Sequence, residues 1–158
     1  MMKSPFTESE CIIQEAWKDG RCPIINGIIY GNGKIKPLNI TYVHDEKVPK
    51  YNISYGGESA DMWLADRGDV KWTYITQLFE THDEQSSMRI SCGEGGMGAD
   101  GYVALSKGED DALVWVAFFD RSNPFTEVRV SGATVYAKTT LDNVWQFPIA
   151  EPQSATIE

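Results

Sequence analysis

The stretch LVWVAFF, at residues 113–119, decides the fold class because all seven of its residues are apolar. A strand that is buried on both faces reads as such a continuous run, whereas a half-buried strand alternates apolar and polar residues. We therefore predict a strand whose two faces both lie in the core. The alternative is a strand that keeps one apolar face exposed for a partner.

Shorter apolar or alternating runs continue this pattern through the second half of the chain. They occupy residues 88–92, 102–105, 127–130, 134–137 and 144–147. Turn-forming stretches such as KGEDD and DRSNP separate them at a spacing of roughly 10 residues, which is typical of an antiparallel meander. We predict a mainly β (α+β) fold in which the meander forms a sandwich or a strongly bent sheet.

One helix is predicted before the β-rich part. Residues 7–10 read TESE, a capping box, and apolar residues then recur on one helical face until Gly20. This pattern predicts a helix over about residues 8–18 that covers one side of the sheet. With β-rich structure over about 24–147 and an irregular arm over about 148–158, the chain 1–158 is expected to form a single domain.

The β-rich part opens with a hairpin signal and contains one ambiguous segment. A β-branched run that ends at Tyr30 is followed by Gly-Asn-Gly at 31–33, and an Asn-Gly pair between two such runs predicts a hairpin. Residues 70–80 fit both a helix face and a strand face. Their β-branched and aromatic residues favour a strand.

The charge of the chain is concentrated in its middle third. The 158 residues carry 23 acidic and 14 basic side chains, a net charge of −9, and residues 58–120 hold thirteen of the acids but only four of the bases. This balance argues against binding to nucleic acid or to an anionic membrane, because both need a basic face. It suits a basic protein partner, although an acidic face that only keeps the protein soluble has the same composition.

A glycine-rich stretch, CGEGGMGADG at residues 92–101, contains the spacing G-x-G-x-x-G. A dinucleotide-binding loop needs a helix N-terminus next, but the strand-like YVAL follows, and two carboxylates in the stretch would repel a phosphate. We therefore predict a loop between two strands in which several residues need a positive φ. A further reading is that the loop presents Met97, between Glu94 and Asp100, as an adaptable recognition contact.

The sequence contains no recognised catalytic or metal-binding motif. His44 and His82 are the only histidines, the three cysteines form no C-x-x-C pair, and no serine has the G-x-S-x-G context. We expect no enzyme activity, no metal and no cofactor. The N-terminus lacks the apolar run of a signal peptide and no stretch reaches a membrane span, so we expect a cytoplasmic protein with structural thiols.

Three segments resemble the small cytoplasmic immunity proteins of bacterial polymorphic-toxin and contact-dependent growth inhibition systems. They are CGEGGMGADGYVAL at 92–105, LVWVAFFDRSNPF at 113–125 and WQFPI at 145–149, and the resemblance covers about residues 86–150. It implies a non-catalytic inhibitor that binds its cognate toxin domain and blocks the active site or substrate surface. It transfers no individual functional residue. The acidic middle third agrees with it, because many such toxins are basic nucleases.

We therefore predict an immunity protein that neutralises a cognate antibacterial toxin, a basic nuclease domain, by stoichiometric occlusion, with no nucleic-acid or membrane partner. Carboxylates would pair with basic groups of the toxin, while aromatic and Met contacts fill the desolvated centre of the interface. The predicted partner-binding residues are Asp61, Trp63, Asp66, Glu94, Met97, Asp100, Glu109, Asp110 and Asp111. The runner-up is a β-sandwich module that binds a carbohydrate or other small ligand, and a small hydrolase is a third hypothesis.

Overall fold

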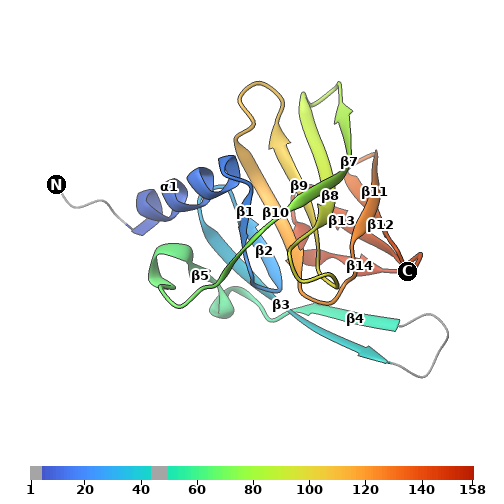
Figure 1. The fold of residues 1–158 in the computed structure, drawn as a ribbon, viewed down its shortest axis with the longest axis horizontal. Helices are drawn as coiled ribbons and strands as arrows, with labels where there is room; N and C mark the ends of the chain where they lie inside the picture. Colours follow the sequence, from blue (N-terminus) through green and yellow to red (C-terminus); the bar gives the residue numbers. More distant parts are fainter. Residues whose placement is uncertain (1–4, 44–49) are drawn as a thin grey trace.

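The computed structural model describes residues 5–43 and 50–158, which form one helix, three 3₁₀ turns and a series of β-strands (Figure 1). The helix is α1 (Pro5–Lys18), and the 3₁₀ turns are η1 (Glu58–Ala60), η2 (Leu64–Asp66) and η3 (Pro152–Ser154). The strands are β1 (Arg21–Pro23), β2 (Gly27–Tyr30), β3 (Lys34–Val43), β4 (Lys50–Tyr55), β5 (Met62–Trp63), β6 (Trp72–Tyr74), β7 (Thr76–Asp83), β8 (Met88–Glu94), β9 (Gly101–Lys107), β10 (Leu113–Phe119), β11 (Phe125–Ser131), β12 (Thr134–Thr139), β13 (Val144–Pro148) and β14 (Thr156–Ile157).

The strands form one large sheet, one small sheet and a two-stranded ribbon, and every pairing in them is antiparallel. The large sheet has the order β4-β3-β2-β10-β9-β8-β7, with β5 added beside β3. The small sheet has the order β11-β12-β13-β14, and β1 pairs with β6 in the ribbon. The prediction of a mainly β, antiparallel, sandwich-like fold with one N-terminal helix is therefore confirmed.

The large sheet lies between two apolar cores, and β10 contributes to both. Trp115, Ala117 and Phe119 face the core shared with the small sheet, whereas Val116 and Phe118 face the core under the helix. All five side chains are at most 1% exposed. This arrangement is why LVWVAFF is a continuous apolar run, and it confirms the prediction of a strand buried on both faces.

The predicted N-terminal hairpin is also confirmed. Strands β2 and β3 pair with Ile29 opposite Ile35, and the backbone N–H of Lys34 donates to Asn32 Oδ1 at 2.9 Å across the turn. Gly33 has a φ of +85°, a conformation that favours glycine. The ambiguous residues 70–80 contain β6 and the start of β7, as the strand interpretation predicted.

Two boundaries differ from the sequence prediction. The helix α1 begins at Pro5, so Thr7 lies inside the helix instead of capping it; proline is well suited to a first helical turn. The segment after Pro148 is not irregular, because it forms η3 and then β14, which pairs with β13. A hydrogen bond of 2.7 Å from the Tyr30 hydroxyl to Gln153 Oε1 also ties this segment to β2.

No helix in residues 5–43 and 50–158 has the length and apolar character that crossing a bilayer requires.

Candidate functional site

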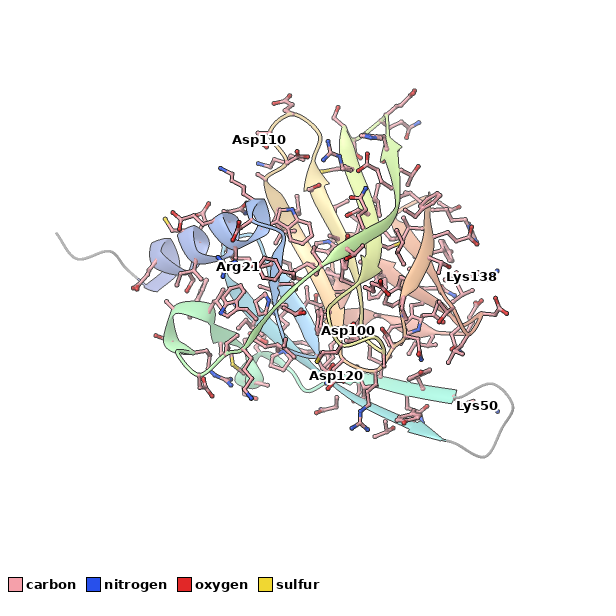
Figure 2. The ribbon with its side chains drawn as sticks, viewed as in Figure 1. Arg21, Lys50, Asp100, Asp110, Asp120 and Lys138 are labelled. Carbon is pink, nitrogen blue, oxygen red and sulfur yellow. The ribbon has the colours of Figure 1, made fainter. Side chains whose placement is uncertain are left out.

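The nine predicted contact residues lie in three separate places. The first group lies between η1 and β5, on β5 and on η2. The second runs from the last residue of β8 into the loop before β9, and the third lies in the turn between β9 and β10. The seven residues of β9 separate the last two groups, a length of roughly 20 Å. Figure 2 shows Asp100 and Asp110 at opposite ends of the molecule's central strands. The structure therefore does not bring the nine residues onto one surface.

In the first group, Asp61 is used by internal contacts. Its side chain is 6% exposed and accepts hydrogen bonds from Lys36 Nζ at 2.8 Å and from the Tyr55 hydroxyl at 2.7 Å. Trp63 is half-buried, with Lys34 Nζ 5.8 Å from its ring centroid. Of the three, only Asp66, at the end of η2, is exposed. Of the two carboxylates in this group, only that of Asp66 is therefore available to a partner.

In the second group, Asp100 holds its own loop together. The Asp100 side chain is completely buried, and its carboxylate accepts the backbone N–H groups of Gly95 at 3.0 Å and Met97 at 3.4 Å. A side chain at Gly95 would collide with this carboxylate. Glu94 is half-buried and Met97 is 49% exposed, so these two remain accessible.

Glycine is needed in this loop mainly where neighbouring atoms leave no room for a side chain. Within the loop Gly98 alone has a positive φ, of +88°, although the sequence predicted several such residues. A Cβ atom at Gly93 would collide with the Thr76 carbonyl of β7, and one at Gly95 with Asp100. The prediction of a glycine-rich loop between two strands is confirmed, since β8 ends at Glu94 and β9 begins at Gly101.

The third group lies beside a second acidic turn that the sequence prediction did not include. The turn between β7 and β8 contacts the turn between β9 and β10, because the Gly108 N–H donates to the Ser87 carbonyl at 2.9 Å. This contact places five carboxylates at one end of the large sheet. We call this surface the acidic tip, and its members are Asp83, Glu84, Glu109, Asp110 and Asp111.

Local hydrogen bonds give both turns of the acidic tip a defined shape. Asp83 Oδ2 accepts the Ser86 hydroxyl at 2.7 Å, and Asp110 Oδ1 accepts the Ala112 N–H at 3.0 Å. Arg89 pairs with Asp111 and lies 3.6 Å from Glu80 Oε2. Glu84 and Glu109 are exposed and have no hydrogen-bond or ion-pair partner within residues 5–43 and 50–158. The tip therefore keeps uncompensated negative charge.

A hollow of about 410 Å³ lies between the two turns. Asp83, Glu84 and Glu109 line it, together with His82 and the Met88 side chain. Carboxylates around an open hollow favour a cationic group, such as a lysine or arginine side chain of another protein.

Exposed apolar side chains lie on the strand that leads into the acidic tip. In the described part of the chain, four large apolar residues are exposed, and three of them belong to β6 and β7: Tyr74 at 68%, Leu78 at 46% and Phe79 at 39%. Strand β7 ends at Asp83 of the tip. An apolar strip next to a charged end is a common composition of a protein-docking surface.

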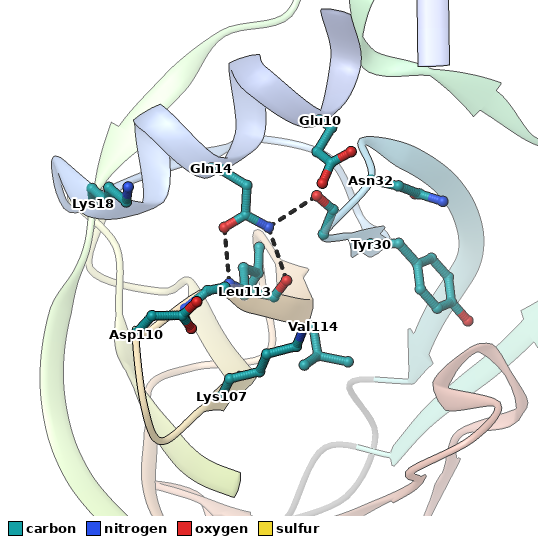
Figure 3. Close-up of a pocket in the computed structure, with 11 residues that line it drawn as sticks. Glu10, Gln14, Lys18, Tyr30, Asn32, Lys107, Asp110, Leu113 and Val114 are labelled. Atoms are coloured by element: carbon teal, nitrogen blue, oxygen red, sulfur yellow. Dashed lines mark hydrogen bonds between the residues drawn. The ribbon is translucent and has the colours of Figure 1, made fainter. Parts of the chain in front are cut away.

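Two cavities flank α1 where it crosses the large sheet. The first, of about 430 Å³, is shown in Figure 3; in it the Gln14 amide donates to the carbonyls of Gly31 and Leu113, each at 2.9 Å, and accepts the Leu113 N–H at 2.9 Å. The second, of about 410 Å³, has aromatic walls from Trp17 and Tyr102. Its polar lining comes from Gln77, Arg89, Ser91, Ser106, Asp110 and Asp111.

Two of the three cysteine thiols, those of Cys22 and Cys92, are buried. Burial raises the pKa of the Cys92 thiol to about 12 and also raises the pKa of Cys22, so both thiols stay protonated at neutral pH. No group of three His, Cys, Asp or Glu residues in 5–43 and 50–158 is placed to hold a metal ion. His44 lies outside the described residues.

Comparisons of the chain with protein-family models, with curated proteins and with solved structures gave no match.

Proposed function

We propose that this chain is an immunity protein that binds a cognate antibacterial toxin domain and neutralises it by stoichiometric occlusion. The observation that carries the proposal is the acidic tip, where Glu84 and Glu109 remain unpaired beside the exposed apolar residues of β7. The resemblance of residues 86–150 to immunity proteins supports the same assignment. A basic nuclease domain is the toxin class whose charge complements this surface.

The two parts of the surface have different roles in the proposed complex. Carboxylates at the rim of an interface accelerate association and make it sensitive to salt, while apolar side chains at the centre slow dissociation. The acidic tip provides the first kind of contact, and Leu78 with Phe79 provides the second. Occlusion needs no chemical step by this chain, because a bound inhibitor that covers the toxin's active surface excludes its substrate.

The first test is co-expression of the full chain with its candidate toxin domain. Rescue of growth, together with co-purification of a stoichiometric complex, is the expected result. Cells that still die, with no complex in the purified material, would refute the proposal for that toxin.

The second test asks whether the acidic tip meets the toxin. The variant Glu84→Lys/Glu109→Lys reverses two exposed, unpaired carboxylates of the tip. The matched control Glu15→Lys/Glu58→Lys makes the same change of net charge on α1 and η1. At low salt we expect the tip variant to associate about ten-fold more slowly, and the control to change association by less than about two-fold. Equal effects of the two variants would show that only net charge matters.

A second candidate function is binding of a carbohydrate or another small polar ligand, and the cavity lined by Trp17 and Tyr102 favours it. Its volume of about 410 Å³ and its mixture of aromatic and polar residues are typical of small-ligand sites. Glucose, galactose and mannose should then raise the thermal unfolding temperature, and Trp17→Ala should abolish the rise. An unchanged unfolding temperature at high sugar concentration excludes these ligands.

A further inference from the structure

Strand β7 is an unpaired edge of the large sheet. It is the last strand in the order β4-β3-β2-β10-β9-β8-β7 and forms a ladder with β8 alone. Its first five residues, 76–80, are all exposed. The small sheet covers one face of this region, because β11 packs against both β7 and β8. The outer backbone edge of β7 has no partner strand within the described residues.

The other edge strands are better protected than β7 against pairing with another chain. Edges are commonly shielded by short length, by basic residues, by proline or by packing. Strand β14 has only two residues, β4 carries Lys50, and β11 carries Arg129. Strand β7 has eight residues with no lysine, arginine or proline. Its shielding features are the register shift between Gln77 and Phe79 and the carboxylates Glu80 and Asp83, which repel acidic strands but not basic ones.

The charge of β7 selects among the strands that could pair with it. Glu80 and Asp83 lie on the strand, and Glu84 follows it directly. A second copy of this chain would bring the same carboxylates against them, and each copy carries a net charge of −9. A segment with lysine or arginine residues meets opposite charge instead, and opposite-charge pairs across two strands are stabilising.

We propose that β7 is a docking strand to which an extended, basic segment of the partner protein adds as a further strand of the large sheet. The main-chain bonds of the new ladder give affinity, and alternate side chains give specificity. Apolar side chains of the segment pack on Leu78 and Phe79, and its cations meet Glu80 and the acidic tip. This inference rests on the proposed function and specifies which structural element of the toxin domain is recognised.

The test uses a peptide probe and the ¹⁵N-labelled full chain. The probe is an acetylated, amidated peptide of four Lys-Val repeats, which matches the eight residues of β7. We expect its amide chemical-shift changes to concentrate on residues 76–83. The same peptide with alternate backbone nitrogens methylated keeps its charge but cannot complete a ladder, so these changes should disappear. No change on β7, or a change that survives methylation, overturns the proposal.

A matched pair of variants separates strand addition from general attraction. Leu78→Lys places a cation on the β7 edge, and Ala60→Lys places the same cation on η1, where Ala60 is exposed. We expect Leu78→Lys to weaken peptide binding at least about ten-fold and Ala60→Lys to weaken it less than about two-fold. Equal weakening by both contradicts docking at β7.

The same variants distinguish failure of this inference from failure of the proposed function. A toxin complex that forms with wild-type affinity on Leu78→Lys refutes docking at β7 and leaves the immunity function standing. Peptide binding at β7 without any toxin complex supports the docking strand and refutes the immunity function for that toxin.

Discussion

The Lys36 ammonium lies 2.8 Å from Asp61 Oδ2 at a site where the two side chains are only 13% and 6% exposed. The Tyr55 hydroxyl completes the cluster, since it donates to Asp61 at 2.7 Å and accepts from Lys36 at 3.0 Å. The three residues belong to β3, to β4 and to the segment before β5. This cluster therefore fastens the β4 edge of the large sheet to the chain that follows it.

Replacement of Asp61 by alanine should strongly destabilise the protein. Lys36 would then be a largely buried cation without its carboxylate, and loss of one partner of a buried pair costs about 3 kcal/mol. The free energy of unfolding, measured with urea, tests this. The control is Asp69→Ala, which breaks the exposed Arg67–Asp69 pair, where Asp69 is 75% exposed. That change should leave the free energy of unfolding almost unchanged, because an exposed ion pair contributes little. Similar losses in the two variants would contradict a structural role for Asp61.

The same pair predicts a pH dependence at the alkaline end. Burial by itself would lower the pKa of Lys36, but its hydrogen bonds to Asp61 and Tyr55 raise the pKa above the ordinary value. A group with a raised folded-state pKa stabilises the fold fully below its unfolded pKa, about 10.4 for lysine, and loses that contribution as the pH rises further. Without Asp61, burial lowers the pKa of Lys36, so the variant is relieved of its buried cation as the pH rises. The difference in unfolding free energy between wild type and Asp61→Ala should therefore be largest near neutral pH and shrink as the pH rises toward and above about 10.4. If the stability difference between the two proteins instead widened as the pH rises, the pKa of Lys36 would not be raised by Asp61.

Asp100 should be required for the shape of the β8–β9 loop. Asp100→Ala leaves the backbone N–H groups of Gly95 and Met97 without their acceptor, which costs about 2 kcal/mol. Amide hydrogen exchange should accelerate at residues 95–97, while the β9 amides beyond them keep their protection. Asp100→Asn retains one oxygen acceptor and should lose less. If alanine and asparagine give the same small loss, the carboxylate does not organise the loop.

The fold was more predictable from sequence than the site, for a physical reason. LVWVAFF predicts burial on both faces of a strand, and Gly-Asn-Gly predicts a tight turn. Both are local properties that depend on the residues of the segment itself. The acidic tip depends instead on the hydrogen bond between Gly108 and Ser87. These residues lie in two turns that are not neighbours in sequence. The meander contained the signal, because every second turn of a meander, here β7–β8 and β9–β10, lies at the same end of the sheet.

Carboxylates show the limit of sequence reasoning most clearly. Asp100 and Asp110 each lie in a polar, turn-forming stretch, yet Asp100 is fully buried and Asp110 is exposed. Their difference depends on whether neighbouring backbone N–H groups turn inward to meet the side chain, which only the three-dimensional structure shows. Asp61 was predicted to contact a partner, and its internal role was missed for a similar reason, because Lys36 is distant in sequence.

The three thiols should differ sharply in reactivity. Cys11 is exposed, while Cys22 and Cys92 are buried, and burial raises the pKa of both buried thiols. Because the thiolate is the reactive species, a thiol reagent such as DTNB at pH 8 should modify one cysteine rapidly in the native protein and all three after unfolding. The Cys11→Ser variant should show almost no rapid reaction. Rapid modification of two thiols in the native wild type would contradict the burial of Cys22 or Cys92.

Hydrogen bonds of the Gln14 side chain should hold α1 against the large sheet. Its amide bonds both the N–H and the carbonyl of Leu113 and also the carbonyl of Gly31, so one side chain joins the helix to β10 and to the β2–β3 turn. Gln14→Ala leaves these backbone groups unsatisfied and should cost about 2 kcal/mol of unfolding free energy. Glu15→Ala, at the neighbouring exposed helix position, should change stability by less than about 0.5 kcal/mol. If the two variants lose the same stability, water replaces the Gln14 amide and the helix is held by Ile13 and its apolar neighbours alone.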